Sequence, residues 1–489
     1  MANDNQGSEL IIGVVCSVGT DYSLIEKPLE DFLKRYGYSF SILSLSDVIE
    51  AILPNDLDKS CEFTRIDTFM NNGNRIREVT KRNDILALCA ATSLNLNRAG
   101  GEIKIPYHNK VHLLRSLKHP DEIHALRQIY GPGFYLIALY STEAERLSFL
   151  QTRKQMSEEQ AKKLIRRDAD ESLPHGQQTR KVFSLADIFL RLNPNRFKET
   201  MEELKRILDI IFGNHQLTPL FDEQMMYYAF AASLRSGSLA RQVGAAIVSE
   251  KKELIAVGTN DAPRPEGGLY WPGKGDNRDL TKGTVDSNDE FKKKIAEDTF
   301  QRLEIKPEHF KECYSRLKKG LLFNITEYGK DVHAEMDALL TCSRNGVSPR
   351  KGTLYTTTFP CHNCARHIIA AGIERVVYIE PYPKSKALEL HQDEIALEEV
   401  KSGSDTRVLF EPFIGVGPRK FPDLFSLGWS SGYPIIRKED GVVLKWNEKD
   451  ARPRVPLIPR SYLDWEGLAV TDTAQLLRQA GLMKREKTE

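Results

Sequence analysis

Two short segments in the second half of the chain restrict its fold and its chemistry more than any other feature. His-Ala-Glu occupies positions 333–335, and Pro-Cys-His-Asn-Cys occupies 360–364. One His and two Cys bind Zn²⁺ and leave its fourth position to water, whereas a structural zinc site usually has a fourth protein ligand. The chain must fold so that the two segments meet. The expected ligands are His333, Cys361 and Cys364, with Glu335 beside the metal as a proton carrier.

The residues around both segments predict the starts of two helices. A helix is expected over 333–343, and a strand at 352–358 leads through Pro360 into a helix at 361–372. Helix N-termini carry partial positive charge, so we expect both cysteines to bind the metal as thiolates. The neighbouring sequence predicts a helix at 222–238, strands at 242–249, 253–258 and 375–380, and a structured insertion at 261–330 with at least one helix inside it, at about 288–318.

The order His-x-Glu, then Pro-Cys-x-x-Cys, is the signature of zinc-dependent base deaminases. Zn²⁺ lowers the pKa of a bound water toward about 7. Glu335 would take a proton, give it to a ring nitrogen, and then help an exocyclic amine leave as ammonia. A structural zinc site and a chance coincidence are the alternatives. We interpret His362 as a bystander, and Cys342 and Cys313 as packing residues.

Composition fits a reducing compartment and gives no global attraction to nucleic acid. The 489 residues suggest two or three domains, and the net charge is +1. Seven cysteines spread over this length do not form a disulfide framework. The polar N-terminus and the lack of a long apolar run predict a cytoplasmic protein without a membrane span.

The first part of the chain predicts a parallel sheet covered on both faces. Apolar runs at 9–18, 84–91 and 133–140 have strand length, and helical stretches separate them. We place this α/β domain at 1–215, an α/β/α zinc domain at 216–400, and a C-terminal extension of the zinc domain at 401–489. Residues 152–182 are dense in charge, which is also typical of a solvated helix and loop.

Residues 220–400 resemble deoxycytidylate deaminase in two blocks. The first is R-Q-V-G-A-A-I-V-S at 241–249 with V-G-T-N at 257–260, and the second contains both ligand segments and G-T-L-Y-T-T-T at 352–358. The resemblance implies that Asn260 bonds the sugar and that the Ala334 amide contacts the base carbonyl. Arg241 would contact substrate or be structural. Trp271 and Tyr270 would stack on a base or pack the insertion.

The whole architecture resembles the two-domain anti-phage dCTP deaminases, whose N-terminal domain is similar to P-loop nucleotide kinases. The likeness rests on G-V-V-C-S-V-G-T-D at 13–21 and L-K-H-P-D-E-I-H-A-L-R at 117–127, with Arg166-Arg167-Asp168 at the expected lid. It implies conversion of deoxycytidine nucleotides to deoxyuridine nucleotides, which deprives a phage of a DNA precursor. It also implies a homo-oligomer.

The phosphate loop departs from the usual P-loop motif. Aligned on Gly19, Thr20 stands at the Lys position and Asp21 at the Ser/Thr position, so the groups that reach phosphate and Mg²⁺ are missing. Backbone amides of residues 17–20 would still cradle a phosphate, which suggests a regulatory nucleotide rather than phosphoryl transfer. The candidate nucleotide-binding residues are Gly13, Ser17, Val18, Gly19, Thr20 and Asp21.

Four functions compete at this point. The leading hypothesis is a deaminase of free dCTP, dCMP or both. The second is a deaminase that edits tRNA or single-stranded DNA, against which the near-neutral charge argues. The third is a nucleotide-binding regulator that has lost deaminase activity, and the fourth is a working kinase fused to a deaminase. The intact ligand set argues against the third, and the absent loop lysine against the fourth.

Overall fold

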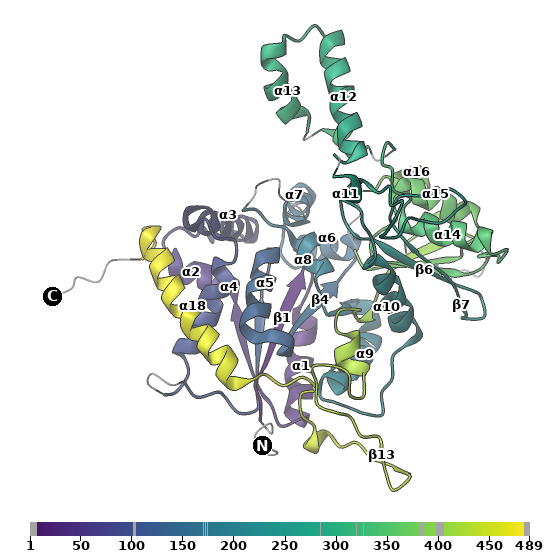
Figure 1. Ribbon diagram of the computed structural model, residues 1–489. Helices are drawn as coiled ribbons and strands as arrows, with labels where there is room; N and C mark the ends of the chain where they lie inside the picture. The colour runs from purple at the N-terminus through teal and green to yellow at the C-terminus, as the bar shows by residue number, and fades with distance from the viewer. Residues whose placement is uncertain are drawn as a thin grey trace. The chain divides into compact units, whose positions relative to one another are not determined.

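The computed structural model describes residues 7–100, 104–169, 171, 173, 175–283, 285–318, 320–325, 327–380, 385–397 and 405–483. Two compact units make up the chain. Unit 1 combines Met1–Glu223 with Ile414–Glu489, and unit 2 is Gln224–Phe413. Unit 2 is therefore inserted into unit 1 (Figure 1). No helix in the described residues is both long and apolar enough to cross a membrane.

Unit 1 is built on a six-stranded sheet with the order β12-β5-β4-β1-β3-β2. The first five strands in the chain pair in parallel, which confirms the predicted parallel sheet, and β12 joins the edge antiparallel to β5. The central strand is buried along nearly its whole length, as expected for a sheet covered on both faces. The strands are β1 (Leu10–Cys16), β2 (Ser39–Ser44), β3 (Lys110–Arg115), β4 (Phe134–Tyr140), β5 (Ile188–Arg191) and β12 (Gly415–Val416).

Helices cover this sheet. Apolar side chains of α1 and α9 join Leu10, Ile12 and Val14 of β1 in one core, while the alternate residues of β1 point to the opposite face. A short hairpin of β13 (Lys438–Glu439) and β14 (Val442–Val443) belongs to the same unit. The helices are α1 (Ser23–Arg35), α2 (Leu45–Ile52), α3 (Glu62–Thr80), α4 (Ile85–Leu96), α5 (Pro120–Tyr130), α6 (Glu143–Thr152), α7 (Glu158–Ala169), α8 (Thr179–Ser184), α9 (Phe197–Ile211), α17 (Phe421–Phe425) and α18 (Pro459–Gln479).

The strand predicted at 84–91 is wrong, because these residues form helix α4. Every residue from Ile85 to Ala91 is buried. Helices α2, α5 and α18 surround α4, so it is apolar on all sides and shows no helical period in its sequence. A short apolar run of this kind cannot be assigned to a strand or a helix from its pattern alone.

The structure also differs from the prediction that 401–489 extends the zinc domain. Ile414–Glu489 belongs to unit 1, where β12 pairs with β5 and α18 packs along α4 (Figure 1, yellow). The chain thus returns to its first domain after unit 2. The prolines and short apolar runs of this region gave no sign of the return, because the contacts it makes are distant in sequence. Two parts of the segment, 401–404 and 484–489, lie outside the described residues.

Glu223 ties together the two places where the chain leaves and re-enters unit 1. Its fully buried carboxylate accepts hydrogen bonds from Arg206 Nη1 and Nη2 at 2.9 and 2.8 Å. It also accepts from the backbone amides of Leu220 at 2.7 Å and Val416 at 2.8 Å. One carboxylate therefore fixes both crossing segments within unit 1.

We predict that Glu223→Gln lowers the free energy of unfolding of unit 1 by about 2–3 kcal/mol, the usual range for hydrogen bonds to a charged group. An amide has the same shape but presents N–H groups where donors already point. Urea unfolding curves of the full chain measure the change. The matched control is Glu202→Gln on α9, an exposed residue paired only with Lys198. Equal stability of the two variants would contradict the assignment.

Unit 2 contains a second six-stranded sheet with the order β10-β11-β9-β8-β6-β7. Strands β8, β9, β10 and β11 are parallel, and β6 and β7 add antiparallel strands at one edge. The predicted strands at 242–249, 352–358 and 375–380 are confirmed with shorter bounds, and the strand predicted at 253–258 is confirmed with a shift of one residue. The strands are β6 (Gly244–Val248), β7 (Leu254–Thr259), β8 (Thr353–Thr356), β9 (Arg375–Tyr378), β10 (Ile395–Ala396) and β11 (Val408–Pro412).

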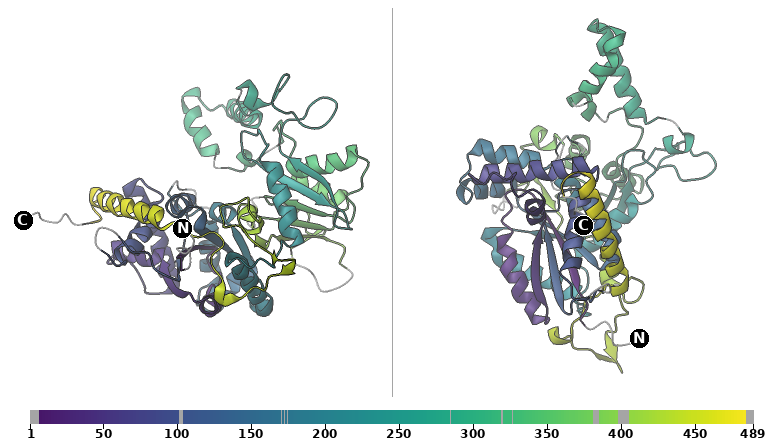
Figure 2. Two further views of the ribbon diagram at one scale, coloured as in Figure 1. Left: turned by 60° about the horizontal axis from the view of Figure 1, so that its bottom comes forward. Right: turned by 90° about the vertical axis from the view of Figure 1, so that its left-hand side faces the viewer.

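The helices of unit 2 also follow the predictions. At least one helix was expected within 288–318, and the structure has two: the first ends at Arg302, and a 3₁₀ turn over Pro307–His309 precedes the second. The two pack side by side as a hairpin, with the rings of Phe300 and Phe310 5.3 Å apart (Figure 2). The helices are α10 (Phe221–Ser233), α11 (Asp279–Lys282), α12 (Ser287–Arg302), α13 (Phe310–Leu317), α14 (Ala334–Arg344), α15 (His362–Ala370) and α16 (Ala387–Leu390).

Candidate metal centre

The three predicted ligands lie at the starts of two helices, as the sequence indicated. His333 is the residue before α14 and has extended backbone angles, with φ −71° and ψ 152°. Cys361 is the residue before α15, and its sulfur accepts a hydrogen bond from the amide of Cys364 at 3.4 Å. Pro360 precedes it outside the helix. The two helix starts therefore present the ligands and partial positive charge at the same place.

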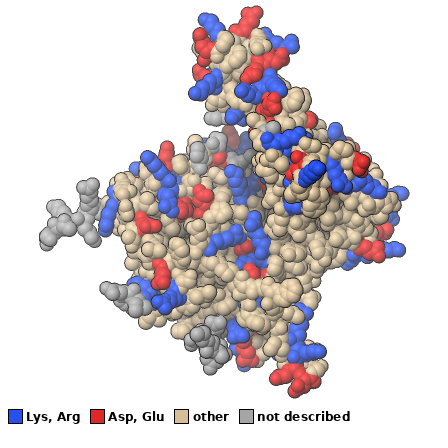
Figure 3. Space-filling view, viewed as in Figure 1, with Lys and Arg blue, Asp and Glu red and all other residues tan. Residues whose placement is uncertain are grey.

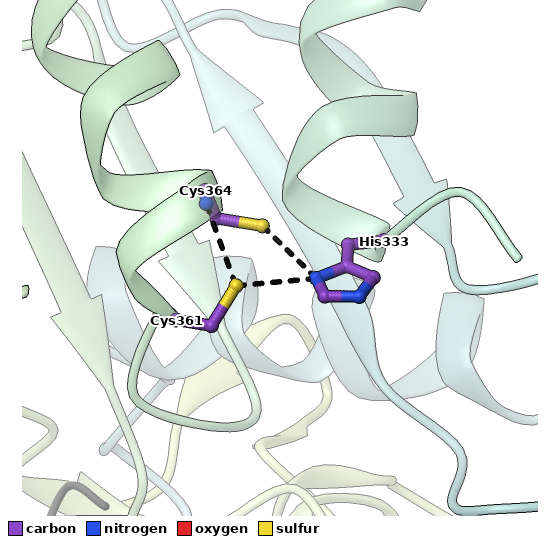
Figure 4. Close-up of side chains that lie close together, drawn as sticks. All are labelled: His333, Cys361 and Cys364. Atoms are coloured by element: carbon purple, nitrogen blue, oxygen red, sulfur yellow. Dashed lines mark hydrogen bonds between the residues drawn. The ribbon is translucent and has the colours of Figure 1, made fainter. Parts of the chain in front are cut away.

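The ligand atoms converge. His333 Nδ1 lies 3.3 Å from Cys361 Sγ and 3.3 Å from Cys364 Sγ (Figure 4). All three atoms lie within 4.8 Å of one another. Bonds of about 2.0–2.3 Å from one Zn²⁺ to nitrogen and sulfur fit such a set. Three protein donors of this kind fit a zinc ion that keeps one position open.

Hydrogen bonds among the three donors shift their pKa values. The hydrogen bond from Cys364, together with that to His333, lowers the pKa of Cys361 to about 4. The hydrogen bond to Cys361 raises the pKa of His333 to about 9. The hydrogen bond with Cys361, and next burial, raise the pKa of the Cys364 thiol well above its ordinary value. Metal binding must therefore release protons from His333 and Cys364, which makes the affinity pH-dependent.

Glu335 stands beside the ligands in the first turn of α14. Only 3% of it is exposed, and burial raises its pKa above the ordinary value. The Cys364 thiol donates to Glu335 Oε2 at 3.4 Å, so this oxygen faces the ligand cluster. The Thr356 hydroxyl donates to Oε1, also at 3.4 Å. The carboxylate is thus held with one oxygen toward the metal position.

Thr356 was missed in the sequence. It is fully buried at the end of β8 and orients the carboxylate of Glu335. The only available signal was its place, since it is a hydroxyl residue ending a strand just before the cysteine segment. In a run of three threonines, 356–358, nothing distinguishes the one that faces Glu335.

Asn260 and Arg241 are connected through backbone. Asn260 Oδ1 accepts from the Val243 amide at 2.7 Å, and Nδ2 donates to the Arg241 carbonyl at 2.7 Å. The Asn260 side chain thereby shapes the segment 241–243. The Arg241 guanidinium is 60% exposed and pairs with Glu380 at 3.2 Å. Its charge counteracts the rise in the pKa of His333, so it lies within electrostatic reach of the cluster.

Trp271 and Ala334 have different surroundings. Trp271 is 60% exposed, and the Arg235 guanidinium lies 3.7 Å from its ring centroid. The same Arg235 donates to the Tyr270 carbonyl at 2.7 Å, which fixes the stack.

Ala334 is buried as the first residue of α14, and an amide at that position has no partner within its helix.

The other Cys and His residues of unit 2 take no part in the cluster. His362 Nε2 lies 3.3 Å from Glu327 Oε1, and Cys342 is buried in the core of unit 2. Within the described ranges, the cluster of His333, Cys361 and Cys364 is the one group of three or more such side chains close enough to share a metal.

The candidate phosphate loop follows β1 in unit 1. Gly19 has φ +87°, and a Cβ there would lie 2.8 Å from the Arg146 carbonyl, so the turn requires glycine. The Val18 amide donates to Asp168 at 2.9 Å, and the Thr20 amide to the Ser17 carbonyl at 3.1 Å. Two of the four amides proposed as a phosphate cradle are therefore already bonded within unit 1.

Three other residues that were predicted together with this loop have structural roles in unit 1. Gly13 lies inside β1, where a Cβ would approach Leu117 and Phe134 at 2.8 Å. Asp21 accepts from the Ser23 amide at 3.3 Å and stabilises the start of α1. Asp168 is fully buried and pairs with Lys118 at 2.8 Å, so at least this part of 152–182 is no solvated surface.

Comparison with known proteins identifies the segment that holds the cluster. Residues 220–380 match the family model described as "Cytidine and deoxycytidylate deaminase zinc-binding region". This segment is similar to the zinc-binding regions of cytidine and deoxycytidylate deaminases. The match includes all three ligands, Glu335 and Thr356, and it covers the greater part of unit 2.

Individual relatives are similar over parts of the chain. Deoxycytidylate deaminase of Enterobacteria phage T2 is 45% identical over 56 residues, which are 12% of this chain and 30% of the relative. Deoxycytidylate deaminase of Mycobacterium phage D29 is 28% identical over 166 residues, 33% of this chain and 94% of the relative. The solved structure of dCMP deaminase from cyanophage S-TIM5 with dCMP and dUMP has 18% identity and a TM-score of 0.23, covering 40% and 99% of the two chains. The chain spans about a third or less of the length of the first three curated relatives it matches.

We predict that Cys364→Ser loses bound zinc. Loss of an outer-sphere partner alone costs about 10- to 100-fold in metal affinity, and loss of a thiolate ligand should cost at least about 100-fold. Zinc per chain is measured after equilibration with a chelator. Cys342→Ser is the control, because Cys342 is equally buried in unit 2 but outside the cluster. Full zinc in Cys364→Ser would move the ligand assignment elsewhere.

Proposed function

We propose that this chain hydrolyses the exocyclic amine of a deoxycytidine nucleotide and produces the deoxyuridine nucleotide and ammonia. The observation that carries the proposal is the convergence of His333 Nδ1 with both cysteine sulfurs at 3.3 Å, beside the buried carboxylate of Glu335. The similarity to phage deoxycytidylate deaminases supports the substrate class.

The roles of the residues follow from their positions. His333, Cys361 and Cys364 would hold Zn²⁺, which supplies acidified water when bound. Glu335 would accept a proton from the attacking water on Oε2, the oxygen that faces the ligands, and give it to the ring nitrogen. It would then take the proton of the newly added hydroxyl and give it to the amine, which leaves as ammonia while the ring carbonyl forms. Thr356 would keep Oε1 turned away. Because Glu335 is buried, a proton it holds passes to the substrate rather than to bulk water.

Substrate contacts are proposed for four further residues. The Ala334 amide, unpaired within α14, would donate to the base carbonyl. Asn260 would act on the sugar or through the 241–243 segment that it shapes. Arg241, 60% exposed and within electrostatic reach of the ligands, suits a nucleotide phosphate. Trp271, stacked on Arg235, would offer a ring face to a base.

The wider role rests on resemblance. We propose dCTP, dCMP or both as substrates, depletion of DNA precursors as an antiviral function, and assembly as a homo-oligomer in the cytoplasm. We also propose that unit 1 is a degenerate P-loop-kinase-like domain that binds a regulatory nucleotide. The parallel sheet of unit 1 and its strand-loop-helix at 10–35 support this part.

Free nucleotides fit the charge of the molecule better than polynucleotides do. The net charge is +1, and Lys and Arg alternate with Asp and Glu over the α12–α13 hairpin (Figure 3). Phosphate-backbone binding depends on a cluster of positive charge, so an editing enzyme would be expected to show one.

A substrate panel tests the proposal. The purified chain is incubated separately with dCMP, dCTP, CTP, dATP and a single-stranded oligodeoxynucleotide, and each deaminated product is quantified. We expect product from dCMP, dCTP or both, and none from dATP or the oligonucleotide. Deaminated product from the oligonucleotide, with none from the free nucleotides, would contradict this proposal and indicate a nucleic-acid editing enzyme.

A further inference from the structure

Unit 1 contains a large cavity that the deaminase chemistry does not use. Its volume is about 910 Å³, within the range of small-molecule sites. The loop at 17–22 forms its floor, and α2, α3 and α6 contribute walls, together with residues 115–118 that follow β3. The cavity thus lies beyond the carboxyl ends of β1 and β3, where open parallel sheets bind ligands.

One wall of the cavity is apolar. Ile66 and Met70 come from α3, and Phe149 and Leu150 come from α6. These four side chains belong to one hydrophobic cluster, in which Met70 is 6% exposed and Leu150 is fully buried. A rigid apolar wall with an aromatic ring suits a flat heterocycle.

The remaining lining is rich in positive charge. Seven Lys or Arg residues and four Asp or Glu residues line the cavity, so positive charge is in excess, although Arg115 pairs with Glu26 of the same lining. Arg115 lies 4.7 Å from the ring centroid of Tyr22, and the charges of Arg115 and Arg65 both oppose the rise that burial causes in the pKa of Tyr22. Lys154 and Arg65 share Glu62, at 3.3 and 2.8 Å. Arg115 therefore lies against the Tyr22 ring, and the guanidinium groups of Arg115 and Arg65 both line this cavity.

A polar group without a partner lies in the same lining. Thr20 is 4% exposed, and its hydroxyl oxygen has no hydrogen-bond partner among the described residues. Buried hydroxyls are usually paired, so this one indicates an acceptor that arrives with a ligand. The nearby amides of Val18 and Thr20 are already bonded, which leaves side chains rather than a loop cradle to hold an anion.

We propose that this cavity binds a nucleoside monophosphate, with its base on the α3–α6 wall and its phosphate on Arg65, Arg115 and the Thr20 hydroxyl. The inference rests on the proposed regulatory nucleotide of unit 1 and adds its class and its contacts. A single phosphate suits a few convergent side chains, whereas a triphosphate needs the amide cradle and lysine of a P-loop. Binding here requires neither zinc nor Glu335.

The test is equilibrium binding to the full-length zinc-loaded chain. The probes are dTMP, dAMP and dGMP, none of which carries a cytosine amine, with dTTP, dATP and inorganic phosphate for comparison. We expect at least one monophosphate to bind with a dissociation constant below about 1 mM, and more tightly than phosphate or its own triphosphate. No monophosphate binding in that range, or a triphosphate that binds tenfold tighter, would overturn the proposal.

Variants locate the site. Arg115→Gln should weaken binding at least tenfold. Gly73→Leu should do the same by filling the cavity, because Gly73 lies on α3 among the lining residues and a Cβ there meets Ile49 only at 3.4 Å. Arg82→Gln, which removes an exposed arginine outside the cavity, should bind within twofold of the original chain. Unchanged binding in Arg115→Gln would reject the site even if Gly73→Leu did not fold. Deaminase failure with intact binding would count against the proposed function alone.

Discussion

Arg98→Met is expected to lower the free energy of unfolding of unit 1 by about 3–5 kcal/mol, the cost of leaving buried charges without their partner. Arg98 is fully buried between two carboxylates. Its Nη2 lies 2.9 Å from Glu9 Oε2 and 2.9 Å from Glu466 Oε1, and its Nε lies 2.8 Å from Glu466 Oε2. Methionine fills similar volume but leaves both carboxylates uncompensated.

Arg98 helps to attach the last helix, α18, to the rest of unit 1. Glu466 belongs to α18, whereas Glu9 and Arg98 come from the first hundred residues, so the cluster joins the two ends of unit 1. Tyr130 also donates to Glu466, at 2.9 Å. Loss of Arg98 should therefore loosen α18 before the sheet unfolds. Hydrogen exchange of α18 amides, compared with amides of β1, would detect the order.

Urea unfolding measures the size of the effect, with Arg82→Met as the matched control because Arg82 pairs with Asp84 on the surface. Combining Arg98→Met with Glu466→Gln should recover part of the loss, since one unpaired charge disappears. Burial opposes ionisation of Glu9, yet hydrogen bonds from His112 and Arg98 keep its pKa below the ordinary 4.5. Its contribution should be present above that pH and decline as the pH falls through its folded-state pKa. A loss under about 1 kcal/mol in Arg98→Met would contradict the account.

Glu335→Gln is expected to lower the rate of deamination by about 10²- to 10⁴-fold, the usual contribution of a general acid–base group. Glutamine retains the contact with Thr356 but cannot carry a proton between water and substrate. Zinc content should be unchanged, because the three ligand atoms come from His333, Cys361 and Cys364. The loss should therefore appear in kcat while bound zinc stays at about the level of the original chain.

Product formation from dCMP or dCTP and zinc per chain are measured on the same preparation. Glu374→Gln is the control, since it makes the same change at an exposed position on the turn before β9. Normal ammonia release by Glu335→Gln would refute the assigned mechanism. Loss of zinc in this variant would instead make Glu335 a ligand.

The metal cluster was predictable because its donor residues lie in two short, recognisable segments of the sequence. The residues at 333–335 and 360–364 carry the donor types, and the alternating strands and helices around them place both segments at helix starts. Thr356 was not predictable, since its contact with Glu335 joins residues 21 positions apart that share no motif. The expected bond of Asn260 to the sugar stays a prediction, and its contacts with the backbone at 241 and 243 were not predicted.

Unit 1 shows the limits of the sequence more clearly. Its parallel sheet was predictable from continuous apolar runs, but α4 was mistaken for a strand because neighbours on every side remove its polar face. The return of the chain through α18 is fixed by contacts such as that between Arg98 and Glu466, which are 368 positions apart. The cavity of unit 1 likewise needs α2, α3 and α6 together, and no single segment carries its pattern.

Removal and return of zinc tests the central claim most directly. The purified chain is stripped of metal with a chelator and then titrated with Zn²⁺, and zinc per chain and deoxyuridine nucleotide formed from dCMP and dCTP are followed together. Product formation should vanish with the metal and return in proportion to about one zinc per chain. Full activity of the stripped chain, or none of the zinc-loaded chain on either nucleotide, would contradict a zinc-dependent deaminase at His333, Cys361 and Cys364.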